Sequence, residues 1–393
     1  MNRLLNAALA ATLIVLAAVP AAAGGEPAYG FKFSGFFKTD AIYDDATIYP
    51  GDYRLWVTPY GDTKDNEFFL TANESRLGFD FWWKEETYTT SAKLEFDFYG
   101  LAAAENKSQV MLRHAYVQMK GEQWLFLAGQ TWDIIAPLNP KTVNYSVLWT
   151  QGNIGYRRPQ LRGSFWTPMG DAATIKLDAG LSRNIFSDLD GDKLDDGTDS
   201  GFPTVQGRLG LDSKFGDGSA VAIGAWGHFG QSVFGPDDSL SVDSWSVGAD
   251  LSVTVSKRVT LMGEFFTGQA LGQYLGGVAQ NTTPMNEALP AMGGWGLVSL
   301  KPADRFTLNV GYGFDDPDNE EWKVPDDGES YTLKDMNSEV FGNVMYDITG
   351  NVQAMLEVAW CKTEYLTRAY GEDDITADYD AMRFQFAIKA GIK

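Results

Sequence analysis

Apolar and polar residues alternate along this chain in many short stretches. Between Phe306 and Phe314, for example, every second side chain is apolar or aromatic, and the side chains between them are Thr, Asn or Gly. Neighbouring side chains of a strand point to opposite faces, so this period predicts strands with one apolar and one polar face. After Gly24 no stretch approaches the roughly 18 to 20 apolar residues that a membrane-spanning helix needs.

The alternation predicts sixteen strands, most of them long enough to cross an apolar band of about 25 Å when tilted. They are residues 30–43, 74–84, 88–99, 109–120, 122–132, 158–168, 172–184, 203–215, 219–230, 243–256, 258–270, 291–301, 305–315, 335–347, 351–365 and 378–392.

The connections between these strands are alternately short and long. The short ones are 85–87, 121, 169–171, 216–218, 257, 302–304 and 348–350. The long ones are 44–73, 100–108, 133–157, 185–202, 231–242, 271–290, 316–334 and 366–377. This pattern predicts an all-β fold, a transmembrane up-and-down antiparallel β-barrel of 16 strands with short periplasmic turns and long extracellular loops.

The N-terminus has the pattern of a secretory signal peptide. Arg3 is followed by an apolar run over residues 4–19 and by Ala at 21–23, an A-x-A cleavage site. We therefore expect a signal peptide over residues 1–23, a single barrel domain over 24–393, and a location in the bacterial outer membrane.

Composition argues against several other classes of protein. The net charge of −21 is unfavourable for binding nucleic acid. The single cysteine, Cys361, excludes an intramolecular disulfide framework. His114 and His228 are the two histidines, and neither has an evident catalytic partner, so we expect no enzyme and no cofactor.

The polar faces of the predicted strands carry many charged residues. The basic ones are Arg76, Lys93, Arg113, Arg162, Lys176, Arg208, Arg383 and Lys389. The acidic ones are Asp80, Glu95, Asp97, Asp178, Asp212, Asp250, Glu264 and Glu357. Either these residues pair across strands and only keep the wall polar, or the cations form a ladder that attracts anionic solutes in a pore.

Four arginines lie beside the long loop 133–157. Arg113, Arg157, Arg158 and Arg162 are therefore the first candidates for a constriction, and Arg76, Lys93, Arg208 and Arg383 complete the candidate pore lining. The loop mixes prolines, aromatic and polar residues, and it either folds into the lumen or remains an ordinary outer loop.

Tryptophans near strand ends fit the aromatic girdles of a membrane barrel. They are Trp83, Trp124, Trp132, Trp166, Trp295 and Trp360. Residues 110–119 and 124–132 are apolar on both faces, which indicates either a misjudged register or a face covered by a neighbouring subunit or an inward loop.

The outer loops are acidic, and one of them resembles a Ca²⁺ loop. Asp188, Asp190, Asp192 and Asp199 occupy positions like those of EF-hand ligands, but Lys193 stands at the place of the turn glycine and no Glu closes the loop. The alternative is a solvated charge run.

Six motifs follow one another in the first part of the chain: residues 35–44 (GFFKTDAIYD), 75–80 (SRLGFD), 93–97 (KLEFD), 112–116 (LRHAY), 128–132 (AGQTW) and 155–162 (GYRRPQLR). Over about residues 30–165 the chain thereby resembles the DcaP-like outer-membrane porins. The resemblance implies a trimeric 16-stranded porin with an arginine-bearing constriction that passes small anions such as dicarboxylates, and it carries a lumen role to Arg113 and Arg162. Two features depart from the family: there is no coiled-coil extension between Ala23 and Tyr29, and the last strand lacks a terminal aromatic residue.

Barrels of 16 to 18 strands leave an aqueous channel. We therefore expect a passive diffusion channel for small hydrophilic solutes, with outer-membrane lipid and lipopolysaccharide around it and a homotrimeric assembly. The alternatives are a sheath around a multihaem cytochrome, although the chain has no haem-attachment motif of its own, or a structural or adhesive barrel.

Overall fold

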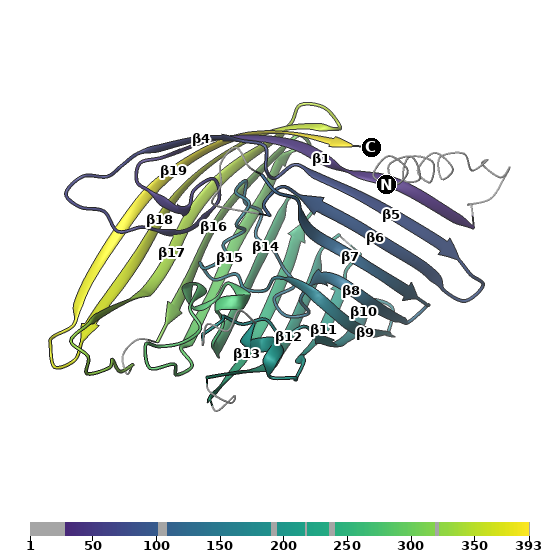
Figure 1. Cartoon of the computed structure of the whole chain (residues 1–393). Coiled ribbons are helices and arrows are strands. Elements are labelled where there is room, and N and C mark those ends of the chain that lie inside the picture. Colours follow the sequence, from purple (N-terminus) through teal and green to yellow (C-terminus); the bar gives the residue numbers. More distant parts are fainter. Residues whose placement is uncertain are drawn as a thin grey trace, which may run out of the picture.

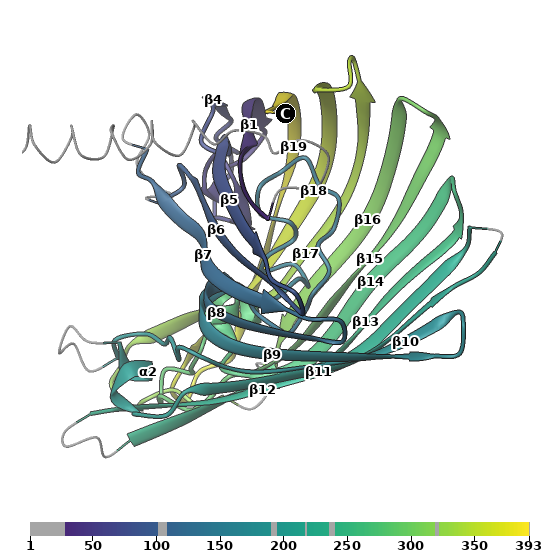
Figure 2. The same ribbon diagram turned by 90° about the vertical axis from the view of Figure 1, so that its right-hand side faces the viewer.

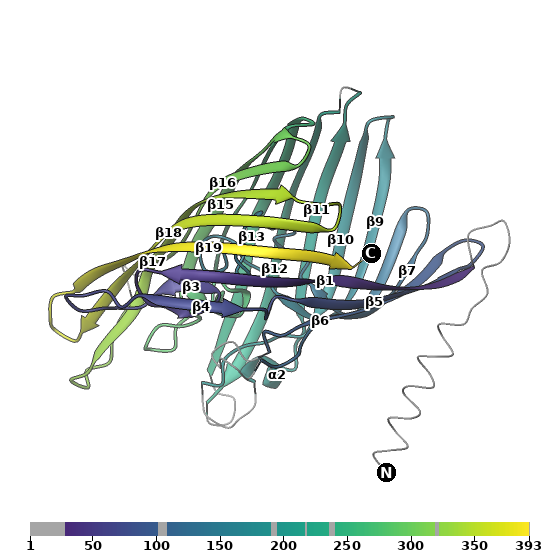
Figure 3. The same cartoon turned by 90° about the horizontal axis from the view of Figure 1, so that it is seen from above.

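The computed structural model describes residues 28–100, 108–189, 195–216, 218–235, 240–318 and 322–392. Long antiparallel strands form one sheet that closes on itself, because β1 pairs with β5 on one side and with β19 on the other (Figures 1 and 3). The strands are β1 (Tyr29–Asp44), β4 (Glu67–Thr71), β5 (Arg76–Lys84), β6 (Thr89–Asp97), β7 (Met111–Lys120), β8 (Trp124–Trp132), β9 (Arg157–Met169), β10 (Ala173–Ser182), β11 (Thr204–Lys214), β12 (Ala220–Phe234), β13 (Leu240–Ser256), β14 (Val259–Gln269), β15 (Pro290–Ala303), β16 (Phe306–Pro317), β17 (Ser330–Asp347), β18 (Val352–Ala369) and β19 (Ile375–Ile392).

The sheet has 17 strand segments but forms a barrel of 16 strands, because β4 and β5 follow each other along β1 and count as one strand of the barrel. Thr71 of β4 is opposite Asp40, and Arg76 of β5 is opposite Phe36. The predicted all-β barrel of 16 antiparallel strands is therefore confirmed.

Tight turns gather at one end of the barrel and longer connections at the other, where α2 (Asp196–Asp199) lies (Figure 2). Two connections predicted to be long, 231–242 and 366–377, are only 235–239 and 370–374. The β12–β13 and β18–β19 ladders continue to Phe234 opposite Leu240 and to Thr367 opposite Ile375. Both hairpins therefore extend past the predicted strand ends.

The remaining elements are short and lie in the long connections. They are the hairpin of β2 (Ile48–Pro50) and β3 (Arg54–Val57), and the 3₁₀ turns η2 (Gly272–Tyr274) and η3 (Gly277–Ala279). Among the described residues, no helix has both the length and the apolar character to cross a membrane.

The two faces of the barrel follow the alternation. Outward side chains such as Leu209, Phe265 and Val310 are exposed, whereas the inward residues of the same strands are polar or packed against loops. An irregularity in the β6–β7 ladder, between Glu95 and Phe96, brings the consecutive residues Arg113 and His114 both to buried positions beside Glu95. A bulge of this kind explains why this strand did not alternate cleanly in the sequence.

Candidate pore constriction

The loop between β8 and β9, residues 133–156, crosses the interior of the barrel. The backbone N–H of Val143 donates to Glu357 Oε2 on β18 at 2.6 Å. Lys38 Nζ on β1 donates to the Val143 carbonyl at 2.6 Å, and Asn144 Nδ2 donates to Gln385 Oε1 on β19 at 3.1 Å. Of the two interpretations of this loop, the inward one is therefore correct.

The connection between β1 and β4 also folds inward, and its anchor is Arg54 on β3. The Arg54 guanidinium is completely buried, forms an ion pair with Glu339, and donates to Glu357 Oε1 at 3.2 Å. The Val57 carbonyl accepts a hydrogen bond from the Tyr365 hydroxyl at 2.7 Å. This segment, predicted as a plain outer loop, instead lies against β17 and β18.

A third loop, residues 270–289 between β14 and β15, completes the inward set. Its backbone N–H groups at Gly277 and Val278 both donate to the Asp315 carboxylate at 3.0 Å. The N–H of Thr150 in loop 133–156 donates to the Leu275 carbonyl at 2.9 Å. Loop 133–156 and loop 270–289 are therefore bonded to each other, and both are bonded to the wall.

Asn337 on β17 joins the first two loops. Its Nδ2 donates to the Leu55 carbonyl at 2.6 Å and to the Thr150 carbonyl at 2.7 Å. A buried amide that satisfies carbonyls from two loops fixes their relative position, because a carbonyl left unpaired in this interior would cost about 1–3 kcal/mol.

An apolar cluster lies inside the barrel under these loops. Leu148 of loop 133–156 is completely buried in one cluster with Trp295, Leu297 and Phe341 of the wall and Ile48 of β2. Burial of each large apolar side chain contributes about 1.5–3 kcal/mol. The prediction that Trp295 belongs to an interfacial girdle is therefore wrong: its ring is inside, and its N–H donates to Glu264 Oε2 at 3.2 Å.

A close backbone approach holds loop 133–156 against the wall. Gly152 has φ +102°, and a Cβ atom there would lie 2.1 Å from the Gly294 carbonyl oxygen of β15. Only glycine fits both the backbone angle and the distance.

Glu95 on the opposite wall is surrounded by three of the predicted pore-lining cations. Its carboxylate lies 3.0 Å from Arg113 Nε, 3.2 Å from Lys93 Nζ and 3.6 Å from Arg76 Nε. Arg76 and Lys93 keep 24% and 25% of their side chains exposed, whereas Arg113 keeps 4%. Arg76 and Lys93 thus lie at the lumen surface, and Arg113 lies behind it.

Arg113 is held by a buried network with loop 133–156. Its Nη1 lies 2.6 Å from Asp97 Oδ2 and donates to the Tyr145 hydroxyl at 3.0 Å, and that hydroxyl donates to Asp97 Oδ2 at 3.1 Å. Burial raises the pKa of the Tyr145 phenol, so the hydroxyl remains a donor.

Three further candidate arginines form ion pairs with single carboxylates. Arg158 Nε lies 3.0 Å from Asp133, Arg208 Nη2 lies 2.7 Å from Asp250, and Arg383 Nη2 lies 2.5 Å from Asp44. Arg158 and Arg383 are completely buried. For these three arginines the structure therefore supports ion pairing within the barrel, and not a ladder of unpaired cations along the pore.

Arg157 and Arg162 differ from the other candidates, because among the described residues neither has a carboxylate within 4 Å. Arg157 is buried and stacks on Trp132 and Tyr156, each ring centroid 4.8 Å from its Cζ. Arg162 is partly exposed, and its Nε donates to Gln160 Oε1 at 3.0 Å.

Arg162 faces the inward loop. It lines a cavity of about 150 Å³ together with Pro137 and Asn139 of loop 133–156. Of the eight predicted pore-lining residues, Arg162 is therefore the one that combines partial exposure, an unpaired charge and a position beside the loop that narrows the lumen.

Sequence reasoning missed several residues that fix this site. Lys38 lies on the polar face of the first strand and could have been found from its alternation. Asn337 and Glu339 also lie on a predicted strand, 335–347, but no local pattern shows that they bind an inward loop. Arg54 had no such signal at all, and it is 303 positions away from its partner Glu357.

The Ca²⁺ candidate is described only in part. Asp190 and Asp192 lie outside the described residues, as does the predicted signal peptide 1–23. Nearby, Asp195 caps α2 through the Gly197 N–H, and Asp196 accepts from the Leu189 N–H at 3.0 Å. Within the described ranges no group of three or more His, Cys, Asp or Glu residues is arranged to hold a metal ion, and Ca²⁺ binding stays a prediction.

Comparison with known proteins gives likenesses of structure alone. No protein-family model and no curated protein sequence matches the chain. The outer-membrane channel DcaP of Acinetobacter baumannii superposes with a TM-score of 0.70 at 17% identity, covering 95% of this chain and 100% of DcaP. An anion-selective porin from Comamonas acidovorans gives 0.56 at 10% identity over 93% of this chain and 100% of the porin.

A third structure is the in-vitro folded outer-membrane protein OmpT of Vibrio cholerae in a trimer form. It gives a TM-score of 0.56 at 12% identity, covering 93% of this chain and 100% of OmpT. At these identities the comparisons establish the fold, and the chain has the barrel architecture of these outer-membrane channels and porins.

Proposed function

We propose that this protein is an outer-membrane porin, a passive diffusion channel for small hydrophilic solutes. The observation that carries the proposal is loop 133–156, which crosses the interior of a closed 16-stranded barrel and is hydrogen-bonded to Glu357 and Gln385 of the opposite wall. A barrel of this width leaves an aqueous interior, and a loop fixed across it narrows that interior to a defined passage. The signal peptide over residues 1–23 belongs to the same proposal.

We extend the proposal to a modest preference for anions at Arg162. Most of the basic candidates share their charge with a carboxylate, which supports a weak rather than a strong preference. Arg162 lacks such a partner among the described residues and lies beside the inward loop. A homotrimer surrounded by lipid and lipopolysaccharide is the assembly we propose, and the trimer form of OmpT supports it.

The alternatives gain no support from the described interior. A cytochrome sheath needs an empty lumen, whereas Leu148, Trp295 and Phe341 pack together inside this one. Both histidines are bonded to hydroxyl groups of the wall, His114 to Thr131 and His228 to Ser244 and Ser246, which supports a non-enzymatic role.

Reconstitution in a planar bilayer tests the proposal. We expect stepwise ion-conducting channels, and a reversal potential in a salt gradient of the sign that anion preference requires. Silent bilayers would favour a structural or adhesive barrel, and a reversal potential of the opposite sign would retain the channel and remove the anion preference.

A further inference from the structure

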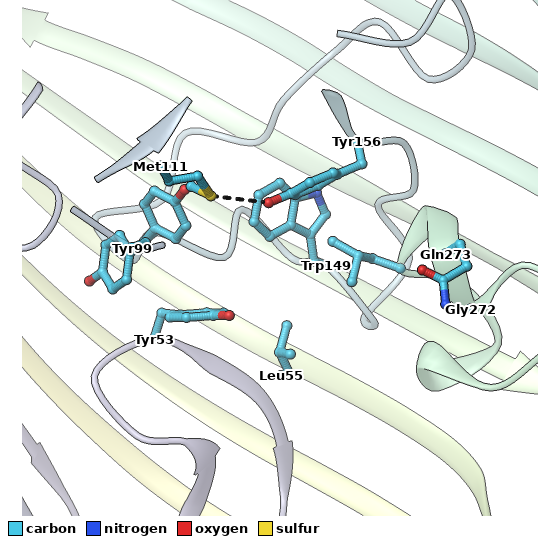
Figure 4. Close-up of a pocket in the computed structure, with 10 residues that line it drawn as sticks. Tyr53, Leu55, Tyr99, Met111, Trp149, Tyr156, Gly272 and Gln273 are labelled. Atoms are coloured by element: carbon cyan, nitrogen blue, oxygen red, sulfur yellow. Dashed lines mark hydrogen bonds between the residues drawn. The ribbon is translucent and has the colours of Figure 1, made fainter. Parts of the chain in front are cut away.

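A pocket lined by aromatic rings lies at the long-loop end of the barrel, between the three inward loops and the start of β7. Its volume is about 160 Å³ (Figure 4). The cavity is called the aromatic pocket below, after the five aromatic residues that line it: Tyr53, Tyr99, Tyr145, Trp149 and Tyr156.

The rings of the aromatic pocket pack against one another, several of them edge to face. Tyr53 and Tyr99 meet at 82°, Tyr145 and Trp149 at 81°, and Trp149 and Tyr156 at 58°. The centroids of these three pairs are 5.2, 5.8 and 5.4 Å apart, so the rings contact one another and together form an apolar wall along the cavity. A site of on the order of 150 Å³ is large enough for one six-membered ring.

Polar groups that have no hydrogen-bond partner, or a distant one, among the described residues line the same pocket. The Trp149 indole N–H is buried, with the residue 3% exposed, and has no hydrogen-bond partner among the described residues. The Tyr53 hydroxyl has no partner in the described part of the chain either, and Figure 4 shows it directed toward Leu55 and the middle of the pocket. Among the described residues, the hydrogen bond of the Gln273 side-chain amide is a long one, 3.5 Å from Nε2 to Ser187 Oγ.

These groups are donors and acceptors that a bound polar solute would satisfy, as buried polar groups require. Burial raises the pKa of the Tyr53 phenol, so its hydroxyl is neutral and can both donate and accept.

The lining of the pocket and the cations stacked on its rings disfavour two classes of ligand. None of the residues that line the pocket is charged, so an anion finds no counter-ion in it. An alkylammonium group, which aromatic rings otherwise attract, meets rings that already carry cations: Arg157 stacks on Tyr156 and Trp149, and Arg113 lies 5.8 Å from the Tyr145 ring centroid.

We propose that the aromatic pocket binds one neutral sugar ring. The C–H faces of a pyranose stack on the aromatic rings, and its hydroxyl groups bond to Tyr53, Trp149 and Gln273. A flat aromatic solute would use the rings but leave these polar groups unpaired. The inference deepens the proposed porin function and rests on it for its meaning, since the pocket would hold a solute at the mouth before the passage beside Arg162.

Calorimetric titration of the detergent-solubilised, folded chain with D-glucose tests the proposal. We expect saturable binding, weakened about three- to tenfold by Tyr53→Ala through loss of one stacking ring. Tyr53→Phe keeps the ring and removes the hydroxyl, and should weaken binding less than Tyr53→Ala does. Tyr43→Ala, which removes an exposed tyrosine from the outer face of β1, is the matched control and should leave the affinity unchanged.

Phenol and choline chloride are the competing probes. The proposal is overturned if D-glucose shows no saturation, if either probe binds more tightly than D-glucose, or if Tyr43→Ala lowers the affinity as much as Tyr53→Ala. Bilayer recordings separate the two proposals. Conducting channels without glucose binding would remove only the sugar site, and glucose binding to a chain that forms silent bilayers would remove the porin function and keep the site.

Discussion

Two regions of the barrel wall carry inward charges and use them differently. On the docked wall (β17, β18, β19 and β1), Glu339 and Glu357 are 0% and 1% exposed and hold Arg54 of an inward loop. On the open wall (β5, β6 and β10), Lys93 and Lys176 keep 25% and 40% of their side chains exposed beside Glu95 and Asp178. The first kind of charge fixes the shape of the passage, and the second kind is available to solutes.

The energetic consequences of the two arrangements differ. A buried ion pair that loses one partner leaves an uncompensated charge, which costs about 3–5 kcal/mol. An exposed pair contributes about 0–1 kcal/mol. Substitutions on the docked wall should therefore change stability and pore size, and those on the open wall should change selectivity alone.

Removal of the Glu357 carboxylate should have the largest effect. Glu357 accepts hydrogen bonds from Arg54 and from the backbone N–H groups of Val143 and Asn144, so Glu357→Ala frees two loops at once. Arg54 keeps its ion pair with Glu339, so the cost comes from the two backbone N–H groups left unpaired. At about 1–3 kcal/mol each, we expect a loss of roughly 2–6 kcal/mol in unfolding free energy and a higher single-channel conductance. Denaturant unfolding and bilayer recording measure the two changes.

Asp80→Ala is the matched control for that substitution, because it removes a 35% exposed carboxylate from the open wall. Equal losses of stability in the two variants would contradict the distinction between the walls.

The second prediction concerns the contact of loop 133–156 with β15. Gly152→Ala places a Cβ atom 2.1 Å from the Gly294 carbonyl oxygen and strains a backbone at φ +102°. The loop should then leave the wall, with a strain cost of about 1–3 kcal/mol and a wider range of single-channel conductances.

Gly155→Ala separates the contact from the backbone angle. Gly155 has φ +97°, but its Cβ would find the nearest atom 3.6 Å away. If Gly155→Ala broadens the conductances as much as Gly152→Ala does, strain alone accounts for the effect and the contact with β15 does not hold the loop.

The open and docked walls also differ in how far the sequence predicts them. Strand positions follow from the alternation of neighbouring residues, so the 16-stranded barrel and its inward charged faces could be predicted. The anchors of the inward loops join positions far apart, as Val143 and Glu357 do across 214 residues. No local pattern distinguishes Glu357, which holds a loop, from Glu95, which faces the lumen.

Trp295 shows the same limit for an apolar side chain. Its place near a strand end indicated an aromatic girdle. Its side chain instead points into the barrel, where it packs with Leu148 in the interior cluster. Alternation assigns two faces to a strand, and only the folded loops determine whether an inward position meets water or protein.

The third prediction uses Arg162 on β9, where the charge lacks an acidic partner among the described residues. In water, two unit charges about 4 Å apart interact with an energy of roughly 1 kcal/mol. Between Arg162 and a passing anion, this energy corresponds to a factor of about five in the ratio of anion to cation permeability. Arg162→Ala should lower that ratio by this amount, and reversal potentials in a salt gradient measure it. Arg162→Lys keeps the charge and should retain most of the preference; a ratio that falls equally in both variants would point to the shape of the guanidinium instead.

The smallest effect on ion selectivity is expected for Lys176→Ala, which also removes one positive charge but removes it from an exposed ion pair. Its Nζ lies 3.1 Å from Asp178 and it is 40% exposed, so the carboxylate and the solvent already screen it. At 0.1 M salt the Debye length is about 10 Å, and Lys176→Ala should change the permeability ratio by less than about twofold. At 0.01 M the Debye length grows to about 30 Å, and the effect should increase. A change at 0.1 M as large as that of Arg162→Ala would mean that selectivity depends on the total charge inside the barrel. The position of Arg162 beside loop 133–156 would then no longer be needed to explain it.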